Sequence, residues 1–211
     1  MSKYRCIIFD CDGVLVDSES VAIGILVDMA NNLGANMNKQ EALINLKGKS
    51  LNRCMQLISE IIKKPLPDAF EHDYRTSTFK AFREQVTPIN GVKTVLEDLN
   101  ISFCVASSGP VNKIKLNLEI TGLLPFFDNN IFSCYTIQKW KPEPDIYLWA
   151  AKTMGFKPEE CLVIEDSISG VIGARRGGFD VYGYTEHDYN NELEQEATKT
   201  FNSMSKLLNM I

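Results

Sequence analysis

The chain has 211 residues, with 22 Lys and Arg against 27 Asp and Glu, so its formal net charge is −5. Hydrophobic residues make up 45% and charged residues 23%, as in ordinary soluble globular proteins. This length fits one domain, or one domain that carries an insertion. The mild acidity argues against a nucleic-acid or membrane-surface binder, because such proteins gather Lys and Arg to meet phosphates. We expect a monomer with a small-molecule partner.

No export or membrane segment is expected near the start of the chain. The apolar run Cys6 to Phe9 stops at Asp10, whereas the core of a signal peptide needs about 7–15 apolar residues. We therefore expect a cytoplasmic protein. There are 6 cysteines, and no two of them form a CxxC pair. We expect buried free thiols in a reducing compartment and no zinc site.

The first predicted element is a short buried strand at residues 6–9, CIIF. It ends abruptly in Asp10, Cys11, Asp12 and Gly13. A brief apolar run that stops at a glycine-containing loop is typical of a parallel strand and its carboxyl end.

A helical insertion is predicted next. Apolar residues at helical spacing predict a helix from about Ser18 to Leu33, which Gly34 ends. Similar patterns predict helices at about 51–63 and 67–85. No strand pattern interrupts residues 18–86.

Helix and strand patterns alternate after residue 88. The predicted strands are 102–106, 131–133, 161–165 and 180–184, and the predicted helices are 91–99, 111–121, 143–154 and 168–176. The tail from about residue 190 is predicted to be helical edge structure. This alternation predicts an α/β fold with a doubly wound parallel sheet. The core would comprise residues 1–16 and 88–211, and residues 17–87 would form a small helical cap domain.

Polar residues follow several of the predicted strands. They are Asp10 and Asp12, then Ser107, Ser108 and Gly109, then Glu165 and Asp166, with Lys141 before a later helix. The carboxyl ends of parallel strands meet at one edge of the sheet, where ligands bind. We therefore expect these side chains to lie on one rim.

Such a rim suits a hard cation and a phosphoryl group. Clustered carboxylates repel unless a cation neutralises them, and oxygen-only ligands favour Mg²⁺, with Mn²⁺ or Co²⁺ as substitutes. Lys141, Ser107 and backbone amides would bind a phosphoryl-sized anion opposite the metal. A carboxylate can act as the nucleophile, and a second one can serve as acid and base.

Four segments carry a family resemblance: FDCDGVLVDS, VASSGP, KWKPEPDIY and VIEDSISG. Together they resemble the four motifs of the haloacid dehalogenase superfamily, in their usual order along the chain. The insertion resembles the small cap of the β-phosphoglucomutase-like branch. Within that branch, SSGPVNKIK and the segment around KWKPEPDIY look most like bacterial 6-phosphogluconate phosphatases.

The resemblance implies a Mg²⁺-dependent phosphatase that acts on a small phosphate monoester through an aspartyl phosphate. Asp10 would be nucleophile and metal ligand, and Asp12 would be acid and base, with its carbonyl on the metal. Ser107 and Lys141 would hold the phosphoryl group, with Ser108 and Gly109 beside them. Asp166 and Glu165 would complete the metal site. The substrate would be a sugar or sugar-acid phosphate, with 6-phosphogluconate leading.

Two other functions stay open at this point. Sugar phosphomutases of the branch carry a His and an Arg where this chain has Ala22 and Leu51, which weakens a mutase reading. A non-catalytic metabolite-binding module is the other alternative. Lys47 and Lys49 in the cap could bind a distal carboxylate, and Lys113 could add positive potential.

Overall fold

The structure is a computed structural model, and it describes residues 3–47, 49–127, 129–188 and 191–211. The chain divides into two compact units, which are described separately. The first consists of Met1–Asp17 and Thr87–Ile211, and we call it the core. The second, Ser18–Val86, is called the helical unit.

Six parallel strands form the sheet of the core, in the order β5-β4-β1-β6-β7-β8. Their bounds are β1 Cys6–Phe9, β4 Ser102–Ser107, β5 Ile131–Ser133, β6 Cys161–Glu165, β7 Asp180–Tyr184 and β8 Lys199–Phe201. Strand β1 pairs with β4 on one side and with β6 on the other. The direction of winding therefore reverses at β1, and such switch points are where doubly wound sheets bind ligands. The predicted fold class is confirmed.

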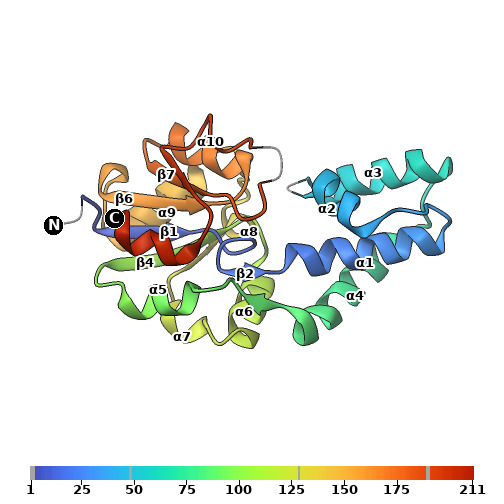
Figure 1. Cartoon of the computed structure of the whole chain (residues 1–211), viewed down its shortest axis with the longest axis horizontal. Coiled ribbons are helices and arrows are strands. Elements are labelled where there is room, and N and C mark those ends of the chain that lie inside the picture. Colours follow the sequence, from blue (N-terminus) through green and yellow to red (C-terminus); the bar gives the residue numbers. More distant parts are fainter. Residues whose placement is uncertain (1–2, 48, 128, 189–190) are drawn as a thin grey trace. The chain divides into compact units, whose positions relative to one another are not determined.

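Helices cover both faces of this sheet (Figure 1). Those of the core are α5 Val92–Asp98, α6 Val111–Ile120, α7 Leu124–Phe127, α8 Cys134–Ile137, α9 Asp145–Met154 and α10 Ile168–Arg176. Cys6 and Ile8 pack in a buried cluster with residues of α9 and α10. On the opposite face, Phe9 meets Phe103 edge-to-face, and Phe103 meets Phe127 of α7 in the same way. Because β1 is buried on both faces, it reads as a continuous apolar run.

Several short elements of the core were not predicted. Strands β2 Val16–Asp17 and β3 Thr87–Pro88 form an antiparallel pair. The prediction of a helical tail was wrong in part, because β8 pairs parallel to β7 before a 3-10 helix at Met204–Asn209. A second 3-10 helix spans Pro158–Glu160. Strands β2 and β3 have only two residues each, and β8 begins with Lys199 and Thr200, so none of the three shows an apolar run or a period of two.

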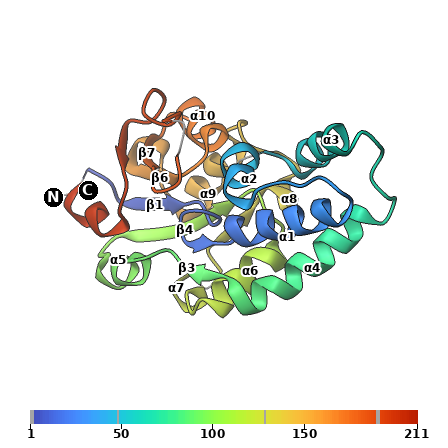
Figure 2. The same cartoon turned by 45° about the vertical axis from the view of Figure 1, so that its right-hand side comes forward.

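The helical unit contains α1 Glu19–Asn32, α2 Lys39–Leu46, α3 Leu51–Ile62 and α4 Phe70–Gln85. Helices α1 and α4 run side by side (Figures 1 and 2). Helix α2 was missed, because its eight residues bury only Ala42 and Leu46 and show little apolar pattern. Its start is marked by Asn38, whose side chain accepts from two backbone amides. None of the described helices is long and apolar enough to cross a membrane.

All six cysteines are free and buried, as predicted. Cys6 and Cys161 lie opposite each other on β1 and β6. The pKa of the Cys54 thiol is raised by its burial. Buried thiols of this kind act as small apolar core residues.

The helical unit offers a matched test of core packing on one helix. Ile58 of α3 is fully buried in the cluster between the helices, whereas Ile61 is 47% exposed. Ile58→Ala is expected to lower the free energy of unfolding by about 2–5 kcal/mol, because it opens a cavity. Ile61→Ala should change it by less than about 0.5 kcal/mol. Urea titration followed by circular dichroism measures both, and equal losses would contradict this packing.

Candidate active site

Three neighbouring strands deliver polar residues to one edge of the core sheet. Asp10 directly follows β1, Ser107 ends β4 and Glu165 ends β6. The register aligns Phe9 with both Val105 and Ile164, so the three strands end at nearly the same level. The Asp10 amide continues the ladder by donating to the carbonyl of Ile164 at 2.9 Å. Asp10, Ser107 and Glu165 therefore lie at the same edge of the sheet, and their chemical roles stay predictions.

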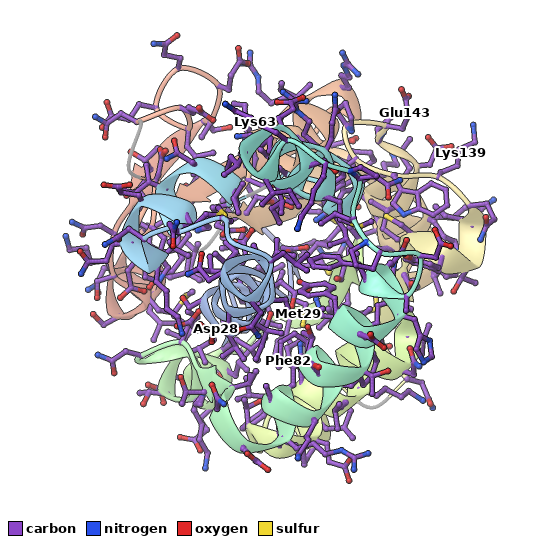
Figure 3. All side chains as sticks on the ribbon, turned by 90° about the vertical axis from the view of Figure 1, so that its right-hand side faces the viewer. Asp28, Met29, Lys63, Phe82, Lys139 and Glu143 are labelled. Atoms are coloured by element: carbon purple, nitrogen blue, oxygen red, sulfur yellow. The ribbon has the colours of Figure 1, made fainter. Side chains whose placement is uncertain are left out.

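Lys141 joins two of these carboxylates. Its Nζ donates to Asp10 Oδ1 at 2.5 Å and also to Glu165 Oε1. The Lys141 side chain is only 4% exposed, while Lys139 and Glu143 in the same loop point outward (Figure 3). The Lys141–Pro142 peptide bond is cis. Lys141 is thus a buried cation held between two carboxylates.

Both carboxylate oxygens of Glu165 accept two hydrogen bonds each from protein groups. Its Oε1 accepts from Lys141 and from the Tyr147 hydroxyl at 2.9 Å. Its Oε2 accepts from the Ser167 amide at 2.8 Å and from the Ser167 hydroxyl at 2.9 Å. Gly170 makes room for this arrangement, because a Cβ there would lie 1.9 Å from Oε1. Glu165 therefore holds Lys141 in the described structure, and its part as a metal ligand stays a prediction.

Burial and neighbouring charges shift the pKa values of this cluster in different directions. Burial raises the pKa of Asp10 well above its usual range, against the pull of Lys141 and with the help of the surrounding carboxylates. Burial also acts on Glu165, but Lys141 and Ser167 outweigh it and lower the pKa of that carboxyl. Burial alone would lower the pKa of Lys141, yet Asp10 and Glu165 hold it well above its usual value. Lys141 is therefore a permanent cation, while Asp10 lies in an excess of negative charge.

Asp12 is held by helix α6. Lys113 Nζ donates to Asp12 Oδ2 at 2.9 Å, and Asn117 Nδ2 donates to Asp12 Oδ1 at 3.3 Å. Lys113 was considered from the sequence only as a source of positive potential. Asn117 was missed, although both residues lie one helical turn apart in the helix after the Ser107 loop.

The loop after β4 is fixed by its own hydrogen bonds. The Gly109 amide donates to Ser107 Oγ at 3.0 Å, and the Ser133 hydroxyl donates to the Gly109 carbonyl at 2.6 Å. Ser107 is buried and Ser108 is exposed. A Cβ at Gly109 would lie 3.4 Å from Ser107 Oγ and 3.7 Å from Asp12 Oδ2. The Ser107 hydroxyl and the Asp12 carboxylate therefore flank the same small space.

Asp166 lies against the loop that carries the first two aspartates. Gly13 has φ +82°, and a Cβ on it would lie 2.0 Å from Asp166 Oδ2. The charge of Asp166 also raises the pKa of Asp10, after the larger effects of burial, Lys141 and Glu165. Gly13 thus allows the backbone beside Asp12 to approach the Asp166 carboxylate closely.

The acidic residues around Asp10 fit a Mg²⁺ ion. In the part of the chain that the structure describes, no group of three or more His, Cys, Asp or Glu side chains is arranged to hold a metal ion. Mg²⁺ is commonly bound through one or two carboxylates, with waters and substrate phosphate as its other ligands. Asp10 and Asp166 supply two, and the excess negative charge at Asp10 is what a divalent cation would neutralise.

The family comparison agrees with this site. A model of the family described as haloacid dehalogenase-like hydrolase matches residues 7–184. The chain belongs to this family. The resemblance stated from the four motifs is confirmed, and the chain is a phosphoric monoester hydrolase that acts on phosphorylated metabolites.

Relatives match along nearly the whole chain. The 6-phosphogluconate phosphatase of Escherichia coli is 30% identical over 208 residues, which cover 98% of this chain and 94% of that protein. Hexitol phosphatase A of the same organism is 30% identical over 84% of this chain and 82% of its own length. A solved haloacid dehalogenase-like protein of unknown function from Agrobacterium tumefaciens has a TM-score of 0.89 at 27% identity, with coverage of 98% and 97%.

Lys47 and Lys49 belong to the helical unit. Lys47 Nζ lies 3.8 Å from Glu19 Oε2, and Lys49 is exposed. Gly48 between them lies outside the described residues. The pairing with Glu19 shows that Lys47 can face a carboxylate, while a part for either lysine in substrate binding stays a prediction.

Tyr147 and Ser167 were missed as parts of the site. Both act on Glu165, Tyr147 from α9 and Ser167 from the start of α10. Ser167 could have been predicted as a helix-capping residue, because serine is preferred before the first turn of a helix, and its side chain accepts from the Gly170 amide. The sequence gives no indication of the part of Tyr147, since an aromatic residue on the apolar face of a helix is most simply interpreted as a core residue.

Removing the buried cation tests the electrostatics of the cluster. Lys141→Met is expected to lower the free energy of unfolding by about 3–5 kcal/mol near neutral pH, because it leaves two buried carboxylates without their cation. Without Lys141, burial raises the pKa of both carboxyls, so the folded variant binds protons that the unfolded chain has released. The deficit should therefore shrink as the pH falls from 8 to 5.

Lys139→Met is the matched control, because Lys139 is exposed in the same loop. It should change stability by less than about 0.5 kcal/mol at either pH. Denaturant unfolding at both pH values provides the measurement. A pH-independent deficit for Lys141→Met would contradict the charge assignment.

Proposed function

We propose that the chain is a Mg²⁺-dependent phosphatase of sugar or sugar-acid phosphates, with 6-phosphogluconate as the leading substrate. The observation that carries the proposal is the contact of Lys141 with Asp10 on the rim where Ser107 ends its strand. A carboxylate beside a permanent cation and a hydroxyl can accept a phosphoryl group, because the cation offsets the charge that gathers there.

In the first step, a carboxylate oxygen of Asp10 attacks the phosphorus atom of the ester. The bond from phosphorus to the ester oxygen breaks, and that oxygen takes a proton from the Asp12 carboxyl and leaves as an alcohol. An aspartyl phosphate forms on Asp10. Lys141 contacts Asp10 and would hold a phosphoryl oxygen at the same place, while the Ser107 hydroxyl donates to another.

In the second step, water attacks the phosphorus atom of the aspartyl phosphate. The Asp12 carboxylate accepts the proton of that water, and inorganic phosphate leaves with Asp10 restored. Ser108 and the Gly109 region, fixed by Ser133, complete the anion site. Mg²⁺, held by Asp10, Asp166 and the Asp12 carbonyl, would supply positive charge to the phosphoryl oxygens and favour ionised Asp10.

The helical unit is proposed to act as a cap that selects the substrate. Lys47 and Lys49 would bind the distal carboxylate of a sugar acid. The similarity to a 6-phosphogluconate phosphatase supports this choice, because that substrate carries both a phosphate and a carboxylate. A mutase is not proposed, since Ala22 on α1 and Leu51 at the start of α3 offer neither a proton carrier nor a phosphate clamp.

A phosphate-release screen tests the function directly. Purified protein is assayed with sugar phosphates, sugar-acid phosphates, glycolate phosphate and nucleotides, with and without Mg²⁺. We expect release from 6-phosphogluconate or a related ester only when Mg²⁺ is present, and loss of at least about a thousandfold in Asp10→Asn. Asp98→Asn, an exposed residue at the end of α5, is the matched control and should keep full activity. A flat profile at background would favour the non-catalytic alternative.

The cap lysines make a separate prediction about substrate choice. Lys47→Ala with Lys49→Ala is expected to reduce kcat/KM for acidic sugar phosphates by about tenfold, because the two charged contacts together would contribute about 1–2 kcal/mol. Activity on neutral sugar phosphates should change little. Steady-state kinetics on a matched pair, 6-phosphogluconate and glucose 6-phosphate, measures the ratio. An unchanged preference would remove both lysines from the substrate site.

A further inference from the structure

The Asp12 carboxylate is held on both of its oxygens by one face of α6. Lys113 Nζ contacts Oδ2 at 2.9 Å, and Asn117 Nδ2 contacts Oδ1 at 3.3 Å. The two donors are four residues apart, so one helical turn places them side by side. Asp12 and Lys113 are both partly buried, with side chains 23% and 24% exposed. This face defines where the Asp12 carboxylate can point.

Asn117 is an unusual residue to find at this position. It is fully buried, and its Oδ1 is a buried side-chain oxygen without a hydrogen-bond partner among the described residues. Ile114 and Leu118 of the same helix are buried apolar residues. A buried unpaired acceptor destabilises a fold, and an apolar side chain of similar size would avoid that loss. The amide is therefore better explained by its contact with Asp12 than by packing.

The contact holds Asp12 toward the phosphoryl site. The position that a Cβ on Gly109 would occupy lies 3.7 Å from Asp12 Oδ2, 3.4 Å from Ser107 Oγ and 3.5 Å from Lys113 Cδ. One small volume is thus bordered by the acid, by the phosphoryl-binding hydroxyl and by the stem of the lysine. Loss of Lys113 or Asn117 would remove a contact that holds the carboxylate beside this volume.

We propose that Lys113 and Asn117 are positioning residues that aim the Asp12 carboxyl at the leaving oxygen of the ester. This inference rests on the proposed function, since it assigns Asp12 the role of acid. A misplacement of about 1 Å can cost on the order of a hundredfold in rate. Neither residue needs to touch the substrate, so their loss should act on turnover more than on binding.

Leaving-group dependence separates this role from a structural one. A sugar alkoxide is a poor leaving group and needs the proton of Asp12 as the P–O bond breaks. The p-nitrophenolate ion is stable near neutral pH and leaves without a proton. The later attack of water on the aspartyl phosphate is common to both substrates, whereas kcat/KM reports only the steps up to loss of the leaving group. A variant with a misaimed Asp12 should therefore lose kcat/KM on a sugar phosphate and keep most of it on p-nitrophenyl phosphate. A variant with a general structural defect should lose both activities alike.

The experiment compares kcat/KM on these two substrates at saturating Mg²⁺. Lys113→Met is expected to lower kcat/KM on the sugar phosphate by about 10–100-fold. On p-nitrophenyl phosphate, kcat/KM should fall by less than about threefold. Lys113→Arg should restore most of the activity, because it keeps a cationic donor. Lys115→Met, an exposed lysine of the same helix, is the control and should match the wild type.

Asn117→Leu gives an independent readout. The substitution removes the unpaired Oδ1 together with the donor to Asp12, so the melting temperature of the variant should be no lower than that of the wild type. Its activity on the sugar phosphate should nevertheless fall, while its activity on p-nitrophenyl phosphate is largely kept. Equal losses on both substrates, or none on either, in the two variants would overturn the inference. A wild-type protein that releases phosphate from neither substrate would instead refute the proposed function, and the inference with it.

Discussion

The site depends on one buried cation between two carboxylates. Lys141 contacts Asp10, which follows β1, and Glu165, which ends β6, so it bridges two adjacent strands at the switch point of the sheet. A buried charge is tolerated only when partners satisfy it, and here the partners are themselves held: Tyr147 and Ser167 bind Glu165. The hydroxyls of Tyr147 and Ser167 fix Glu165, and Glu165 in turn fixes the position of Lys141. Phosphoryl transfer requires such fixed positions of the groups around the phosphorus atom.

The electrostatic asymmetry between the two carboxylates separates their roles. Glu165 accepts four hydrogen bonds, and its pKa lies below the usual value, so it stays ionised as the anchor of Lys141. Asp10 is also buried but accepts from fewer of the described donors, and burial together with nearby carboxylates raises its pKa. A carboxylate with unsatisfied charge is the one that gains most from a metal ion or a phosphoryl group. This asymmetry supports the proposal that Asp10, and not Glu165, accepts the phosphoryl group.

Much of the fold could be predicted because its strands are short, apolar and closed by polar residues. CIIF before Asp10 and CLVIE before Asp166 were predicted correctly as strands, while the order of the strands and the switch point at β1 came from the structure. Strand β8 and helix α2 were not predicted, since each contains too few apolar residues to show the pattern of a strand or of an amphipathic helix. The alternation of helices and strands thus predicts the central sheet and its helices well, but it does not predict the short elements at the edge of the sheet.

The site was predicted less completely than the fold, for a physical reason. Polar residues at the carboxyl ends of apolar strands can be recognised in the sequence, as Asp10, Ser107 and Glu165 were. The residues that orient them lie on helices, where Tyr147 and Asn117 read as ordinary core positions. Only the three-dimensional contact of Asn117 with Asp12 reveals that its amide is used. The donors to Glu165 likewise come from three separate segments, so its contact with Lys141 could not be predicted from the sequence, while its part as a metal ligand stays a prediction.

The identity of the phosphoryl acceptor is the central claim, and trapping it is the most direct test. An acyl phosphate can be reduced by borohydride, which converts the carboxyl of an aspartate to the alcohol of homoserine. Protein quenched during turnover of a phosphate ester, reduced and mapped by mass spectrometry should carry homoserine at Asp10 and nowhere else. Modification at another carboxyl, or an unmodified Asp10 under conditions of rapid turnover, would contradict the account.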